Sequence, residues 1–316
     1  MKHLFQYIFI VLLCVTITGV AQKPSQELEN YIRQNDAEKR LAEYKDNNDL
    51  LALKVRHLAV INASRKKHKA PALQLDILAS RMANKMAADA AKNGFSGHFN
   101  LNGESPYHRY ASAGGQDHVV ENAAATTSSA DFVPDDENIL EGMYELHQAF
   151  MNEKAPNDGH KQTCIGKTFT HVGIGVAWHG KEFRYYEEYL NRYLAFGEVK
   201  SSVKAGTDIT LSVKPLEKGY HLYSVVAYYE AVPKKMTAKQ VSAIASYADY
   251  TSNVAANIAP WELPQPDDKG FVHISIPTKK KGLYYIHVFL DTKPYVKGKA
   301  TTQGKIIGSG VVVEVK

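Results

Sequence analysis

The sequence is poor in cysteine, and neither sign of charge dominates it. Only Cys14 and Cys164 occur among 316 residues, and Cys14 lies in an N-terminal segment that we expect to be removed. The mature chain would then hold one thiol, more typical of a buried structural residue than of a reactive one, and no intramolecular disulfide. Basic residues number 38 and acidic residues 33. This small, scattered excess gives no basis for nucleic-acid binding.

Standard catalytic signatures are also missing. The sequence contains no His-Glu-x-x-His zinc motif, no paired Cys-x-x-Cys, no Gly-x-Ser-x-Gly elbow and no glycine-rich phosphate loop. Each of these motifs places a nucleophile, a metal or a phosphate by local geometry alone. Any functional site must therefore be assembled from residues that are far apart in the chain.

The N-terminal segment has the pattern of a secretory signal. Lys2 and His3 precede an apolar run from Tyr7 to Thr18, and small residues lead up to Ala21. The run is short for a membrane span, which needs about 20 residues. A retained anchor is one alternative, and Cys14 suggests a lipoprotein as another, although a long apolar run continues beyond it. We predict a signal peptide over 1–21, cleavage near Ala21, and a secreted, periplasmic or cell-envelope protein without a transmembrane span.

The next part of the chain predicts an α+β domain over 49–195. Residues 22–48 are charged with weak helical periodicity and predict a solvated helical leader or a partly ordered stalk. Helical spacing of apolar residues then recurs three times, and a Ser-Pro start marks a fourth, short helix. Alternating strands follow late in the domain. The expected elements are helices from Asp49, from Asp76 to Asn93, over Tyr107–Ala113 and over Glu137–Glu153, and strands near Val172–Val176 and Phe183–Tyr189.

Short strands dominate beyond residues 192–204, which we take as the linker between two independently folding units. Turn signals rich in Gly, Asp and Lys separate the strands, which predicts an all-β, immunoglobulin-like sandwich over 202–316. A helix within Thr237–Ile258 interrupts the pattern. The expected strands lie near 209–213, 220–229, 272–276, 283–290 and 306–315.

Short motifs follow one another between Asp49 and Tyr193. They are Asn62–Arg65 with Pro71–Leu73, Gly97-His98, Tyr107–Arg109, Glu121-Asn122, Phe150–Glu153, Gly159-His160 and Val172–Ala177. In this order they resemble the motifs of the CAP superfamily, which contains cysteine-rich secretory proteins, antigen 5 and plant pathogenesis-related class 1 proteins. Val120 and Phe150 stand where the family has Gly and Trp, which is typical of a divergent branch. The resemblance implies a CAP-type α-β-α sandwich.

The resemblance further implies a central cleft formed by His98, Glu121, Glu153 and His160. Two imidazoles can bind a divalent metal such as Zn²⁺, with carboxylates completing or orienting the ligand shell. A helix through Glu153 would place this carboxylate on its apolar face, where it needs a partner. The alternative is a frayed helix end with Glu153 in water. Glu121 could instead satisfy backbone groups at a strand start.

By the same resemblance Ser105 and Tyr107 border the cleft, although capping and packing explain both equally well. We favour an exported CAP-domain protein that binds a small ligand, a lipid or an envelope component in this cleft without catalysis. A metal-dependent, peptidase-like hydrolase with Glu121 or Glu153 as general base is one alternative. An envelope adhesion protein acting through the C-terminal sandwich is another. A fold resemblance does not by itself supply an activity.

Overall fold

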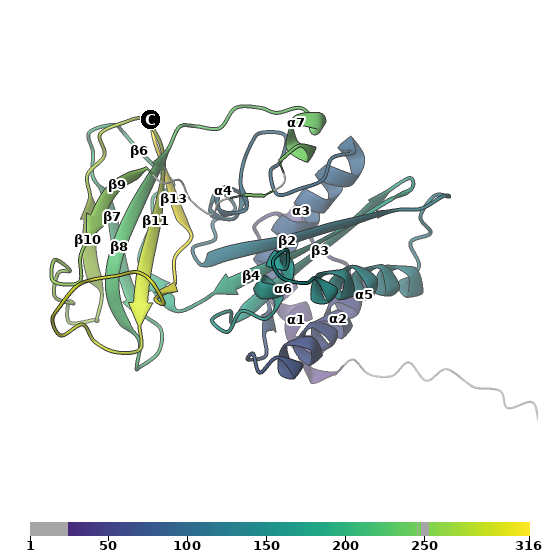
Figure 1. Cartoon of the computed structure of the whole chain (residues 1–316), viewed down its shortest axis with the longest axis horizontal. Helices are drawn as coiled ribbons and strands as arrows, with labels where there is room; N and C mark the ends of the chain where they lie inside the picture. The colour runs from purple at the N-terminus through teal and green to yellow at the C-terminus, as the bar shows by residue number, and fades with distance from the viewer. Residues whose placement is uncertain (1–24, 245, 248–252) are drawn as a thin grey trace, which may run out of the picture.

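The computed structural model describes residues 25–244, 246–247 and 253–316. The predicted signal peptide, with Cys14, lies outside the described residues. Within these residues, no helix has the length and apolar character needed to cross a membrane. The described chain forms a mixed helix-and-strand part and a C-terminal β part that lie side by side (Figure 1).

A four-stranded sheet forms the centre of the N-terminal part, with strand order β1-β3-β4-β2. Strand β4 is antiparallel to both β2 and β3, whereas the short β1 is parallel to β3. Strand β2 lies at the sheet edge, so one of its sides is open to other segments. The strands are β1 (Gln74–Leu75), β2 (His118–Thr127), β3 (His171–His179) and β4 (Glu182–Asn191).

Helices cover both faces of this sheet, which gives the α-β-α arrangement expected from the sequence. Helices α2 (Asn48–Lys67) and α5 (Asp136–Asn152) pack on one face in a core that includes Val172 and Ile174. Helix α3 (Ile77–Asn93) covers the other. Its close approach requires glycine on β3, because a Cβ at Gly175 would lie 2.4 Å from the Cβ of Ala83.

The predicted helix ends are confirmed where local capping sets them. The Asp76 side chain accepts a hydrogen bond from the Ala79 amide at the start of α3, and Gly94 ends the helix in the left-handed region with φ 65°. Ser105 caps α4 (Pro106–Ser112) in the same way. Helix α5 ends at Asn152, one residue before Glu153, and α6 (Gly159–Cys164) follows.

The leader forms the expected charged helix, most of whose residues are exposed, and one side of it packs against the domain through Tyr31 and Asn35. It forms α1 (Gln26–Ala37) and the 3-10 turn η1 (Ala42–Tyr44). The side-chain oxygen Oδ1 of buried Asn35 accepts a hydrogen bond from the Arg81 guanidinium. Buried Asp46 forms an ion pair of 2.8 Å with Lys54 of α2. Asp46 therefore meets its partner inside the fold, which the sequence pattern does not reveal, whereas Glu27, Glu29 and Arg33 are exposed.

The C-terminal part is mostly β, as predicted, and consists of two sheets with an apolar core that includes residues of both. One sheet has the order β10-β7-β5, and the other β6-β13-β11-β8-β9 with β12 paired to β11. The strands are β5 (Leu194–Phe196), β6 (Ser202–Val203), β7 (Ile209–Pro215), β8 (His221–Glu230), β9 (Val254–Ile258), β10 (Val272–Ile276), β11 (Gly282–Asp291), β12 (Ile306–Ile307) and β13 (Val311–Val315).

Two details of the predicted sandwich differ in extent. The helix expected within Thr237–Ile258 is present as the five-residue α7 (Ala238–Ser242) with Thr237 as its N-cap, and β9 occupies the end of that range; residues 245 and 248–252 lie outside the described residues. The single strand expected over 306–315 is divided into β12 and β13, because the small residues Gly308–Gly310 interrupt the apolar alternation.

The segment that we took as a linker takes part in the C-terminal sheets. Strand β5 pairs with β7, and β6 pairs with β13. The two parts also share an apolar cluster, in which Tyr107 and Val119 of the first contact the region of Leu283 and Tyr285 of the second. A backbone hydrogen bond of 2.8 Å from Gly310 to Gln116 joins them as well. The composition change near residue 192 therefore marks a change of architecture, and not an extended connector.

Candidate metal and ligand cleft

Two histidine–glutamate pairs meet beside the edge strand β2. His98 lies in the loop after α3, and its Nδ1 is 2.9 Å from Oε1 of Glu121 on β2. His160 lies in the first turn of α6, and its Nδ1 is 2.5 Å from Oε1 of Glu153. The two imidazole rings are 6.3 Å apart between centroids. The structure thus brings these four residues into one cluster; we call this cluster the cleft, after the site that the resemblance implies.

Glu153 reaches the cleft by a turn of the backbone. Helix α5 ends at Asn152, so Glu153 does not lie on the apolar face of a helix as expected. Its second carboxylate oxygen accepts hydrogen bonds from the backbone amides of His160 at 3.0 Å and Lys161 at 3.3 Å. Acceptance of amides by a carboxylate stabilises the start of a helix. Glu153 therefore caps α6 and orients the His160 ring, and it is not left in water.

Glu121 is held by a buried ion pair. The Arg109 guanidinium on α4 donates a short hydrogen bond to its Oε2. Burial alone would raise the pKa of Glu121, but the Arg109 charge and the His98 hydrogen bond hold that pKa below its usual range. The carboxylate is therefore ionised at neutral pH. Removal of one partner from such a buried pair typically costs about 3–5 kcal/mol.

A second buried carboxyl lies beside Glu121. Glu188 is directly opposite Glu121 in the antiparallel register of β2 and β4. Its burial and the neighbouring Glu121 charge raise the pKa of Glu188 well above the ordinary value. Sequence reasoning missed Glu188, and it treated Arg109 only as part of a motif. The strand register, which would have revealed the pair, is a tertiary property.

Both imidazoles keep one nitrogen available. Among the described residues, no hydrogen-bond partner reaches Nε2 of His98 or of His160. Histidine ligands of metals commonly direct their other ring nitrogen to a carboxylate, which fixes the ring orientation and raises its basicity. The His98–Glu121 and His160–Glu153 pairs have this arrangement. The two pairs therefore each present an imidazole that is oriented by a carboxylate.

Ser105 and Tyr107 have other contacts. The Ser105 hydroxyl accepts from the His108 amide as the cap of α4. Tyr107 is completely buried; its hydroxyl lies 3.1 Å from Nδ1 of His118, and its ring is 5.7 Å from that of His287 in the C-terminal part. Ser105 therefore acts as a helix cap, and Tyr107 packs at the interface between the two parts. These are the roles that the sequence analysis gave as alternatives to a place in the cleft.

A second titratable group lies in the core behind the cleft. His57 on α2, His147 on α5 and Glu187 on β4 are all buried, and their ligand atoms lie within 4.8 Å of one another. This group could hold a metal ion. Asn122 links it to the cleft, because its side-chain amide donates to the His160 carbonyl at 3.1 Å and to Glu187 at 3.3 Å.

Most polar atoms of this buried group have hydrogen-bond partners within the protein, whereas Nδ1 of His57 has none among the described residues. Glu187 accepts from the Tyr185 hydroxyl at 2.5 Å and lies 2.7 Å from Nδ1 of His147. Nε2 of His57 lies 2.7 Å from the Tyr185 hydroxyl. Burial lowers the pKa of His57 to about 3, which keeps it neutral. A metal here would displace these bonds, so the group fits a structural network better than a metal centre.

Sequence reasoning missed this group because its members lie on three elements. His57 and His147 are buried with the apolar faces of α2 and α5, where a single histidine is more often a core residue than a ligand. The only feature of the sequence that sets these two histidines apart is their place on the apolar faces of α2 and α5. Nothing in the local pattern shows that both face Glu187.

The fold and the cleft define an α-β-α domain with a histidine–glutamate cluster at one sheet edge. Residues 58–189 match the CAP family, described as the cysteine-rich secretory protein family, and this part of the chain is a CAP domain. A search among curated proteins gives no match.

Two solved structures are similar to the chain. An extracellular SCP-domain protein of Bacillus anthracis is 18% identical over 42% of this chain and 38% of its own, with a TM-score of 0.32. An outer surface protein of Borrelia burgdorferi is 17% identical over 45% of this chain and 93% of its own, with a TM-score of 0.36. This chain thus spans well under half the length of the Bacillus protein.

Proposed function

We propose that this protein is an exported CAP-domain protein whose His98–His160 cleft binds Zn²⁺ and, with it, a small molecule, a lipid or a cell-surface component. The paired arrangement of imidazole and carboxylate carries the proposal. In each pair the carboxylate orients Nδ1, which leaves Nε2 as a ligand atom. Residues 1–21 would act as a cleaved signal peptide that delivers the chain to the envelope or the medium.

The same contacts argue against the hydrolase alternative. A general base toward a metal-bound water needs a carboxylate oxygen free to take the proton. Glu121 is engaged by His98 and Arg109, and Glu153 by His160 and two backbone amides. Both carboxylates therefore act as orienting groups, and we propose a binding function without catalysis.

For the C-terminal part we propose an immunoglobulin-like sandwich over 202–316. Its two sheets and common apolar core support this assignment. Adhesion to an envelope component through this part is the second candidate function. The apolar cluster that joins it to the CAP domain would then fix the orientation of the two binding surfaces.

Titration calorimetry of the mature protein with Zn²⁺ tests the metal site. We expect one site at pH 7.5, and loss of specific binding in the double variant His98→Ala/His160→Ala. Glu153→Gln should weaken binding by about 10–100-fold, as for other changes in the groups that orient metal ligands. Binding should also weaken at acid pH, because a protonated imidazole cannot bind a metal.

The matched control replaces His179 and His221, which are exposed and lie outside the cleft, by alanine. This double variant should bind as the wild type does. Zinc binding that persists without His98 and His160, but disappears in His147→Gln, would assign the metal to the buried group and refute the cleft site. Absence of any Zn²⁺ binding by the wild type would refute the metal and leave a polar cleft.

A further inference from the structure

A segment of the C-terminal part extends over the CAP domain. It leaves β8 at its end, carries α7, and lies above α3 in the view of Figure 1. We call residues 231–244 together with 246–247 the strap. Because β8 pairs with β11 and β9 within the C-terminal sheet, the start of the strap is fixed to that part.

Several contacts anchor the strap to the CAP domain. The Met236 amide donates to the Leu101 carbonyl at 2.8 Å, and the Ser96 amide donates to the Ser242 hydroxyl at 3.1 Å. Val241 of α7 is 1% exposed in an apolar cluster that includes Phe95. These contacts lie on the α3 side of the sheet, the side from which His98 approaches the cleft.

The strap ends on the cleft. The Tyr247 hydroxyl accepts a hydrogen bond of 2.7 Å from the Glu121 amide and donates one of 3.3 Å to the Glu121 carbonyl. Its ring lies 4.3 Å from the ring of His98. Peptide groups on the open side of an edge strand need partners from elsewhere. Tyr247 supplies both partners at the residue that carries the cleft carboxylate.

We propose that Tyr247 is a residue of the cleft supplied by the C-terminal part, and that the strap covers the His98 half of the cleft. The His98 side chain is 13% exposed and that of His160 is 36% exposed. An ion or a small group then enters beside His160, whereas a long chain contacts His98 only after the strap is displaced. This inference rests on the proposed function, because it takes His98 and His160 as the ligand site.

Chemical modification of the imidazoles tests the cover without any metal. We would treat the mature protein with diethyl pyrocarbonate at neutral pH and measure the rate at each histidine by peptide mass spectrometry. In the wild type, His160 should react faster than His98. In Tyr247→Ala, the His98 rate should rise about tenfold, since the lost hydrogen bonds change a closed-to-open equilibrium by about that factor. The His160 rate should change little.

Two further variants make the result decisive. Tyr144→Ala removes an exposed tyrosine of α5 and should leave both rates unchanged. Val241→Ser loosens the strap away from the cleft, so it should also raise the His98 rate, and it keeps the test valid if Tyr247→Ala does not fold. Unchanged His98 rates in the folded Val241→Ser and Tyr247→Ala proteins would overturn the proposal. A protein that exposes His98 in these variants but never binds Zn²⁺ would retain the strap and lose only the metal function.

Discussion

A buried histidine pair at the interface between the two parts should make stability fall in mild acid. His118 of β2 and His287 of β11 are 5% and 1% exposed, and their rings lie 6.1 Å apart. Burial lowers the pKa of His118 to about 3, with a smaller contribution from His287, and burial lowers that of His287 to about 4. Both imidazoles are therefore neutral in the folded protein at pH 5.

The unfolded chain binds protons at these positions below a pKa of about 6.5. Between pH 6.5 and pH 4 the unfolded state holds more protons than the folded state, so the free energy of unfolding decreases as the pH falls. Each histidine contributes about 1.4 kcal/mol per pH unit in this range. From pH 7.5 to pH 5.0 each should cost about 2 kcal/mol, and the pair about 4 kcal/mol.

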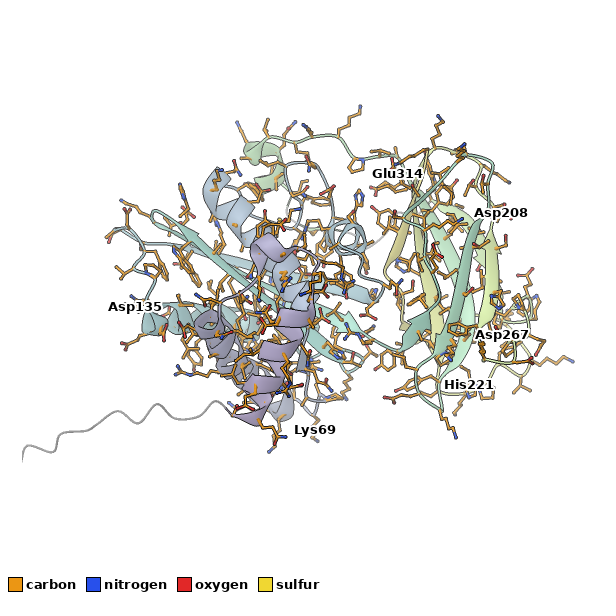
Figure 2. All side chains as sticks on the ribbon, turned by 180° about the vertical axis from the view of Figure 1, so that it is seen from behind. Lys69, Asp135, Asp208, His221, Asp267 and Glu314 are labelled. Atoms are coloured by element: carbon orange, nitrogen blue, oxygen red, sulfur yellow. The ribbon has the colours of Figure 1, made fainter. Side chains whose placement is uncertain are left out.

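Urea unfolding of the mature protein, followed by circular dichroism at both pH values, measures this effect. His287→Gln removes one titrating group, so its loss of stability between pH 7.5 and pH 5.0 should be about 2 kcal/mol smaller than that of the wild type. The control is His221→Gln, because His221 lies at the surface at one end of the β part (Figure 2). An unchanged pH dependence in His287→Gln would refute the reasoning.

Two other predictions concern packing and processing. Gly175→Ala should destabilise the protein by about 1–3 kcal/mol, because the new Cβ meets Ala83 of α3. A Cβ at Gly159 would have no neighbouring atom within 4 Å, so Gly159→Ala should change the free energy of unfolding by less than about 0.5 kcal/mol in a urea titration. If the two variants are equally stable, close packing of α3 on β3 does not limit stability. Intact-mass spectrometry of the exported protein should show a chain that begins at Gln22, and a mass that includes residues 1–21 would contradict cleavage.

The sequence alone determined the features that depend on near neighbours. Asp76, Gly94 and Ser105 fix helix ends through bonds or backbone angles within a few residues, so their roles are legible without the fold. Apolar alternation likewise predicted most strands of the C-terminal part. The ordered motifs identified the CAP domain, and they named His98 and His160 before any geometry was known.

Tertiary structure alone decided which polar groups meet. Burial of the Asp46–Lys54 pair and the convergence of His57 with Glu187 depend on which helix faces contact which strands. Tyr247 reaches Glu121 across 126 positions of the chain. A periodic pattern shows that a face is apolar but not which face it will cover, because that choice depends on the packing of the whole chain.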